Sequence, residues 1–194
     1  MLPISWVTEF LAHYTGISLE LVVDNAYLDL LVSGVDLAFR PESLLDESAT
    51  RRVLQRSRRR LVASPKYLEA CGTPADLDEL SQHECLVVSR NSGPDTWCLN
   101  GPEGRVEVRV RSRFLASSYT PVRQAAVDGL GIAFLYDVYA KRDIEGGSLV
   151  PVLDQYRSDP SNYCAVFPDH RHIRRVATIF AEAVQKQLIE TYQE

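Results

Sequence analysis

Apolar residues recur at helical spacing at the start of the chain, and two apolar runs follow them. The helical positions are Ile4, Val7, Phe10, Leu11 and Tyr14. Pro3 suits a first helical turn and Thr15-Gly16 ends the predicted helix. Residues 17–23 alternate between apolar and polar side chains and then become wholly apolar, which predicts a strand that enters a core. A short helix over 27–32 and a second strand over 35–39 complete the first predicted unit.

This β-α-β rhythm indicates parallel strands joined by right-handed crossovers. In such sheets, ligands bind beyond the carboxyl ends of the strands. The residues that fall there are Asp24, Asn25, Tyr27, Arg40 and Pro41.

The middle and end of the chain alternate between short strands and helices. Residues 51–64 predict two strands, Ser64-Pro65 begins a short helix, and Asp76-Leu77 begins another helical turn. Further strands are expected at 86–88, 97–99, 105–111, 114–116, 132–135 and 164–167. The hydroxyls of Ser117 and Ser118 can cap a helix that runs to Val127, and a final helix has an apolar face from Ile173 to Leu188.

The 194 residues allow one large domain or two small ones, at about 150 residues per domain. We expect an α/β protein of two lobes with a ligand cleft between them. Residues 1–85 form the first part of lobe I, residues 86–140 form an inserted lobe II, and residues 141–194 return to lobe I.

The composition excludes several classes of protein. Apolar residues make up 45% and charged residues 24% of the chain, as in ordinary globular domains. The net charge of 21 − 26 = −5 does not favour binding to nucleic acid. No apolar run is long enough to span a membrane, and no signal peptide is visible. The four cysteines show no metal-binding spacing and are expected to be free, buried thiols in a reducing compartment, which indicates the cytoplasm.

The motifs of common catalytic sites are missing from the sequence. There is no HExxH, GxSxG, P-loop or GxGxxG, so we expect neither an enzyme nor a cofactor. His170 and His172 alone make a weak metal site, and we expect no metal. The run Arg51 to Arg60 contains six arginines and no aromatic residue, and we interpret it as a solvated strand face rather than a nucleic-acid surface.

Polar residues at predicted strand ends are the candidate ligand site. Arg40 can hold a carboxylate through two parallel hydrogen bonds, or it can pair with Asp24, Asp36 or Glu42. Ser117, Ser118 and Tyr119 lie at a helix N-terminus, which favours an anion, although capping alone also explains them. The remaining candidates are Tyr136 and Asp137 after one strand, and Ser89, Arg90 and Asn91 after another. A second positive charge at Arg90 suits a carboxylate or another acidic small molecule.

Five stretches, in register along nearly the whole chain, resemble the effector-binding domain of LysR-type transcriptional regulators. They are Trp6 to Leu21, Val35 to Arg40, Val62 to Leu68, Ala125 to Ala133 and Gly147 to Leu153. The resemblance implies the fold of type 2 periplasmic binding proteins, with a small-molecule effector between the lobes and Arg40 at a position that often contacts an anionic effector. It also implies a homodimer or tetramer through antiparallel pairing, in which the helix over 4–13 meets the helix over 122–127. A polar exterior on both helices would count against that pairing.

The chain departs from the family pattern at its start. Met1 falls at the beginning of the first helix, so we expect the DNA-binding domain, the linker helix and the first strand of the effector domain to be absent. DNA would then be bound only through that absent domain. A truncated gene product or a mis-set start codon would explain this, or another segment fills the place of the strand. The alternative functions are a transporter's solute-binding protein and, without any motif to support it, an enzyme that reuses the fold.

Overall fold

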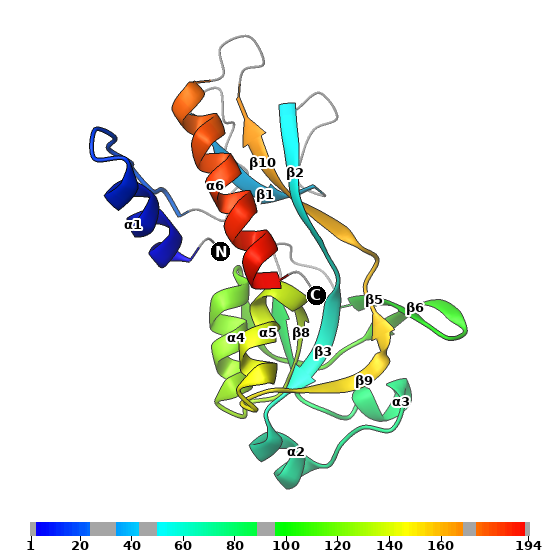
Figure 1. Cartoon of the computed structure of the whole chain (residues 1–194). Helices are drawn as coiled ribbons and strands as arrows, with labels where there is room; N and C mark the ends of the chain where they lie inside the picture. Colours follow the sequence, from blue (N-terminus) through cyan, green and yellow to red (C-terminus); the bar gives the residue numbers. More distant parts are fainter. Residues whose placement is uncertain (1–2, 24–33, 43–49, 89–95, 169–173, 193–194) are drawn as a thin grey trace. The chain divides into compact units, whose positions relative to one another are not determined.

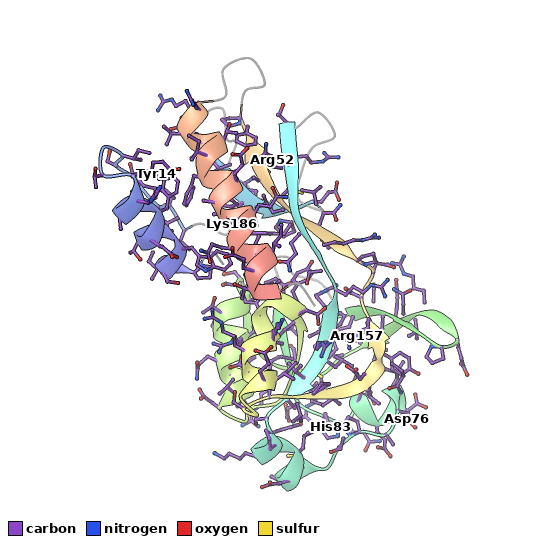
Figure 2. All side chains as sticks on the ribbon, viewed as in Figure 1. Tyr14, Arg52, Asp76, His83, Arg157 and Lys186 are labelled. Carbon is purple, nitrogen blue, oxygen red and sulfur yellow. The ribbon has the colours of Figure 1, made fainter. Side chains whose placement is uncertain are left out.

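The computed structural model describes residues 3–23, 34–42, 50–88, 96–168 and 174–192, in two compact units (Figures 1 and 2). Unit 1 comprises Met1–Arg56 and Ser161–Glu194, and unit 2 comprises Ser57–Pro160. The predicted lobe boundaries at 85/86 and 140/141 differ from these. Residues 57–85 and 141–160 join unit 2 because β3 (Arg59–Ala63) pairs with both β8 (Ile132–Tyr136) and β9 (Val150–Arg157).

Unit 1 is built on a sheet with the order β1-β10-β2. Its strands are β1 (Ala38–Pro41), β10 (Ser161–Phe167) and β2 (Thr50–Ser57). The prediction of parallel strands is wrong for β1, which pairs antiparallel with β10 from Ala38 opposite Val166 to Pro41 opposite Tyr163. The β-α-β pattern predicted that β1 is a strand but could not identify its partner strand, which lies more than 100 residues away in the chain.

Two helices cover the core of unit 1. The predicted first helix is confirmed as α1 (Ile4–His13), with Trp6, Val7 and Phe10 buried. The C-terminal helix is α6 (Arg175–Tyr192). Its Phe180 ring lies 4.8 Å from the ring of Phe10 on α1 and 5.9 Å from that of Phe39 on β1. Phe180 therefore joins both helices and the sheet in one apolar cluster.

The strand predicted over 17–23 is not present. This segment forms no strand in the structure, and Leu21, Val22 and Val23 are 44%, 59% and 69% exposed. An apolar run becomes a strand only where a neighbour satisfies its backbone hydrogen bonds, and none of the described strands pairs with it. The second predicted strand begins at Ala38 rather than Val35. The predicted helix over 27–32 lies outside the described residues.

Unit 2 has a mixed sheet with the order β6-β5-β9-β3-β8-β4-β7. The additional strands are β4 (Cys85–Val88), β5 (Thr96–Gly101), β6 (Gly104–Arg109) and β7 (Ser112–Ala116). β4 is parallel to β7 and β8, and β3 is antiparallel to its two neighbours. The edge strands β6 and β7 are joined by only two residues, Val110 and Arg111, which span about 11 Å at most. The sheet must therefore curl until its edges approach each other.

Alternation of the side chains along β8 explains why Ile132 to Leu135 are all apolar. On β8, Ile132 and Phe134 face one core, while Ala133 and Leu135 face another. The second core is covered by α4 (Tyr119–Val127) and α5 (Asp137–Glu145), through Val122, Ala126 and Ala140. The two short predicted helices are confirmed as α2 (Pro65–Cys71), capped by Ser64, and α3 (Leu77–Leu80). The hydrophobic pattern did not predict α5, because most of its residues are polar. It did not predict β9 either, because Pro151 and Asp154 break the apolar pattern of that strand.

The cysteines differ from the expected buried set. All four are free, but Cys71 is exposed and Cys98 is half-buried. We expect a disulfide reagent such as DTNB to modify Cys71 rapidly and Cys98 more slowly in the native protein. Cys85 should not react before unfolding, because it is fully buried and burial raises the pKa of its thiol to about 12, which leaves little thiolate. Peptide mapping would contradict this if Cys85 were modified as fast as Cys71.

Candidate functional site

One edge of the unit 2 sheet gathers most of the described candidate residues. The parallel strands β4, β7 and β8 all end at this edge. Ser117 and Ser118 follow β7, and Tyr136 is the last residue of β8. The prediction that ligand-facing residues follow parallel strands thus selects a single region of unit 2. Ser89, Arg90 and Asn91 follow β4 but lie outside the described residues, as do Asp24, Asn25 and Tyr27.

Three tyrosines pack together where α4 and α5 begin. The Tyr119 ring lies 5.2 Å from that of Tyr136 and 5.1 Å from that of Tyr139, on which it stacks. Burial raises the pKa of Tyr119 to about 12. Tyr119 therefore keeps its proton at neutral pH and remains a hydrogen-bond donor.

The N-terminus of α4 has a serine whose hydroxyl does not cap it. Ser118 occupies the N-cap position, yet its side chain makes no capping hydrogen bond. The interpretation of Ser118 as a capping residue is therefore wrong for its hydroxyl. By contrast, Ser64 at the start of α2 accepts a hydrogen bond from the Tyr67 amide at 3.3 Å. The first backbone N–H groups of a helix have no partner within it, so this end of α4 favours negative charge.

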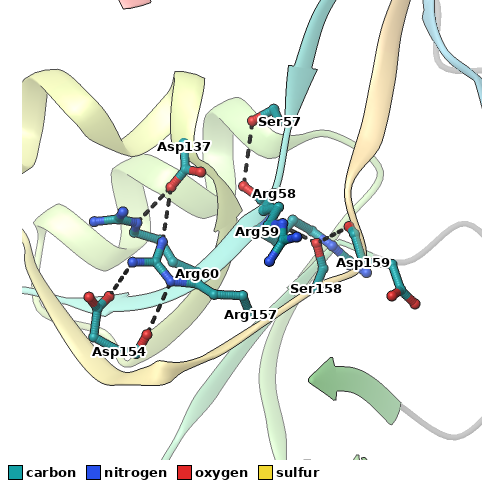
Figure 3. Close-up of polar contacts among 9 residues, drawn as sticks. All are labelled: Ser57, Arg58, Arg59, Arg60, Asp137, Asp154, Arg157, Ser158 and Asp159. Atoms are coloured by element: carbon teal, nitrogen blue, oxygen red, sulfur yellow. Dashed lines mark hydrogen bonds and ion pairs between the residues drawn. The ribbon is translucent and has the colours of Figure 1, made fainter. Parts of the chain in front are cut away.

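The carboxylate of Asp137 is already bound by two arginines (Figure 3). Its Oδ1 accepts a hydrogen bond from Arg60 Nε at 2.6 Å and one from Arg157 at 3.2 Å. Arg157 also pairs with Asp154 at 2.7 Å. Asp137 thus joins β3, β9 and α5, which gives this predicted site residue a structural role.

The sequence interpretation missed Arg59. The arginine run is solvated at Arg56 and Arg58, as predicted, but Arg59 and Arg60 are only partly exposed. The Arg59 guanidinium carbon lies 4.3 Å from the centre of the Phe134 ring and 5.8 Å from that of Tyr136. Its backbone N–H donates to the buried Ser158 hydroxyl at 2.8 Å (Figure 3). Arg59 is two residues before Leu61 on the same strand, so the alternation of side chains already indicated that it faces inward.

Arg40 belongs to unit 1, where it lies on β1 opposite Cys164. Of the acids considered as its partners, Asp36 forms an ion pair with Arg174 and Glu42 forms one with Arg51. Asp24 lies outside the described residues. A contact between Arg40 and a ligand stays a prediction.

Two kinds of feature are absent from the described part of the chain. No group of three or more His, Cys, Asp or Glu side chains is placed to hold a metal ion there. No helix in the same residues has the length and apolar character to cross a bilayer. His170 and His172 lie outside those residues.

The chain matches the family named LysR substrate binding domain over residues 4–189. The chain belongs to this family. The match confirms the resemblance recognised in the sequence and the two-lobed fold of type 2 periplasmic binding proteins. Proteins of this family are transcriptional regulators rather than enzymes.

Individual curated relatives are also LysR-type regulators. The transcriptional regulator CrgA of Neisseria meningitidis serogroup C is 32% identical over 182 residues, which is 93% of this chain and 60% of CrgA. The transcriptional activator TtdR of Escherichia coli K12 is 29% identical over 91% of this chain and 58% of its own length. The chain thus spans about 60% of the length of these curated relatives.

Solved structures show the same fold. The CrgA regulatory domain from Neisseria meningitidis has a TM-score of 0.85 at 30% identity, over 96% of this chain and 92% of that one. Full-length AphB, a virulence activator of Vibrio cholerae, has a TM-score of 0.78 at 29% identity, over 96% of this chain and 63% of AphB. The LysR domain therefore accounts for both units.

Proposed function

We propose that this LysR domain senses a small anionic molecule at the edge of the unit 2 sheet where Ser118, Tyr119 and Tyr136 converge. The observation that supports it is the contact between the Tyr119 and Tyr136 rings at the start of α4, where Ser118 is the N-cap residue. The Ser118 hydroxyl makes no capping bond, and the phenol of Tyr119 stays protonated. All three supply donors to an anion where the dipole of α4 also favours negative charge.

Binding would act on transcription through the oligomer. A ligand shifts a conformational equilibrium only by its difference in affinity for the two states. In a regulator that carries a DNA-binding domain, that shift would change the geometry of the DNA-bound oligomer, and the protein would work in the cytoplasm. The cleft between lobes stays a prediction. The relatives are transcriptional regulators, which favours this function over a transporter's solute-binding protein.

Self-association is part of the proposal, in the form of a homodimer or tetramer. The antiparallel pairing of α1 with α4 has less support, because the exterior of α1 is largely polar. The exposed residues of α1 are Ile4, Ser5, Thr8, Glu9, Ala12 and His13, and those of α4 are Pro121 and Gln124. Ile4, 63% exposed, is the large apolar exception. Sedimentation velocity of the chain and its Ile4→Glu variant tests the pairing, and an unchanged dimer would exclude it.

The ligand site is tested by a thermal-shift screen with small carboxylates, amino acids and inorganic phosphate. A ligand at 100 times its Kd should stabilise the protein by about 2.7 kcal/mol. We expect Ser118→Ala to reduce this shift while it changes the stability of the free protein by less than about 0.5 kcal/mol, because the hydroxyl caps nothing.

Ser64→Ala is the matched control. It removes a serine that does cap its helix, so it should cost about 1 kcal/mol in the free protein and leave the ligand-induced shift intact. If Ser118→Ala left the shift unchanged, or Ser64→Ala abolished it, the placement of the ligand at the start of α4 would be wrong.

A further inference from the structure

The half-buried arginines of unit 2 differ in whether a carboxylate binds their guanidinium group. Arg60, Arg123 and Arg157 each bind a carboxylate, at 2.6, 2.5 and 2.7 Å. Arg59 has none among the residues that the structure describes. A guanidinium keeps its charge at any physiological pH, so Arg59 is a partly desolvated cation without a described counter-ion.

The surroundings of Arg59 are aromatic. Its guanidinium lies over Phe134 and beside Tyr136, within the distances of cation–π contacts. Its Nε is inaccessible to solvent and has no hydrogen-bond acceptor in the described structure. Rings compensate a cation only in part, whereas a carboxylate matches the planar fork of a guanidinium with two parallel hydrogen bonds. Arg59 therefore combines positive charge, planar donors and apolar walls.

We propose that Arg59 recognises the carboxylate of the ligand and that the ligand is an aromatic carboxylate. The assignment rests on the proposed function and specifies its ligand. The rings of Tyr119, Tyr136 and Tyr139 lie within 5.2 Å of a neighbour in the cluster and are each partly exposed. They offer ring faces and edges to a flat apolar group, and such aromatic pairs contribute beyond the area they bury. An aliphatic acid or phosphate would engage Arg59 and leave these rings unused.

A purely structural role for Arg59 is the competing explanation. Its backbone N–H binds Ser158, and its side chain covers Phe134. The backbone bond survives any side-chain substitution. A side chain that only covers Phe134 would change stability when it is replaced, without changing ligand affinity, and this separates the two roles.

The test is isothermal titration of the full chain with four probes: benzoate, cyclohexanecarboxylate, benzamide and inorganic phosphate. We expect benzoate to bind at least about tenfold more tightly than the other three. Arg59→Gln should weaken benzoate by about tenfold or more, and Arg59→Lys should do likewise because it keeps the charge but loses the fork. Arg58→Gln, at an exposed neighbouring position, should leave the affinity within about twofold.

Each other outcome is decisive. Equal binding of benzoate and cyclohexanecarboxylate would overturn the aromatic class, and binding of phosphate alone would overturn the carboxylate while the proposed anion sensing survived. No binding of any probe, or benzoate binding that both Arg59 variants retain, would overturn the assignment of Arg59. If Arg59→Gln does not fold, Arg59→Lys decides, together with a benzoate-induced change in the tyrosine absorbance of the unsubstituted protein.

Discussion

Replacing Asp143 with alanine should lower the free energy of unfolding of unit 2 by about 2–4 kcal/mol. Asp143 lies on α5 and is 7% exposed. Its two carboxylate oxygens accept hydrogen bonds from Nε and Nη2 of Arg123 on α4, both at 2.5 Å. Without Asp143 the guanidinium loses its partner in a largely buried site. The loss stays below that of a fully buried pair because the Arg123 side chain is 33% exposed and can turn to water.

The two tryptophans allow this loss to be assigned to unit 2. Trp6 is buried in unit 1 and Trp97 in unit 2. Urea unfolding followed by Trp97 fluorescence, in a Trp6→Phe background, should show the shift. Asp128→Ala is the control, because this exposed residue at the end of α4 accepts only one side-chain hydrogen bond, from Gln124, and should cost less than about 0.5 kcal/mol. A loss of less than about 1 kcal/mol of unfolding free energy for Asp143→Ala would contradict the prediction that the Arg123–Asp143 ion pair stabilises unit 2.

Local signals in the sequence predicted elements wherever short-range physics decides the outcome. Pro3 with an apolar face gave α1, and Ser64-Pro65 gave the start of α2 with its cap. These features depend on residues within the first turns of each helix, so the local sequence is enough to recognise them. The strand β8 was predicted from its run of four apolar residues, Ile132 to Leu135, which is typical of a strand that is buried on both faces, as β8 is within unit 2.

Pairing between distant strands was not predictable in the same way. β1 finds its partner β10 across more than 100 residues, and residues 17–23 have the composition of a strand without a described partner. The units differ from the predicted lobe boundaries for a related reason: β3 is central in the unit 2 sheet because β8 and β9 pair with it from much later in the chain. The composition of a strand does not show which other strand will pair with it.

Some residues of the candidate site could be identified from the sequence, and others could not. Ser118, Tyr119 and Tyr136 lie where β7 and β8 end, at one edge of the unit 2 sheet, and their contact with a ligand stays a prediction. Arg59 was hidden in a run of like residues, and only its position two residues before Leu61 places it on the same face of β3 as Leu61. The engagement of Asp137 depends on Arg157, which no local pattern connects to it.

Replacing Phe180 with alanine should lower the free energy of unfolding of unit 1 by about 3–5 kcal/mol. The side chain is 7% exposed and forms edge contacts with Phe10 and Phe39. Alanine would remove these contacts and leave a cavity that α1 and β1 cannot both close, because each is fixed by its own neighbours. Urea unfolding followed by Trp6 fluorescence in a Trp97→Phe background measures the change.

Val176→Ala is the matched control for Phe180→Ala. Val176 lies four residues earlier on α6 and is 43% exposed, so its truncation should cost less than about 0.5 kcal/mol. The comparison separates loss of core packing from any change in helix propensity, since both variants place alanine on the same helix. A Trp6 transition that moved equally little in both variants would mean that Phe180 does not join α1, α6 and β1. Other residues of the apolar cluster would then hold unit 1 together.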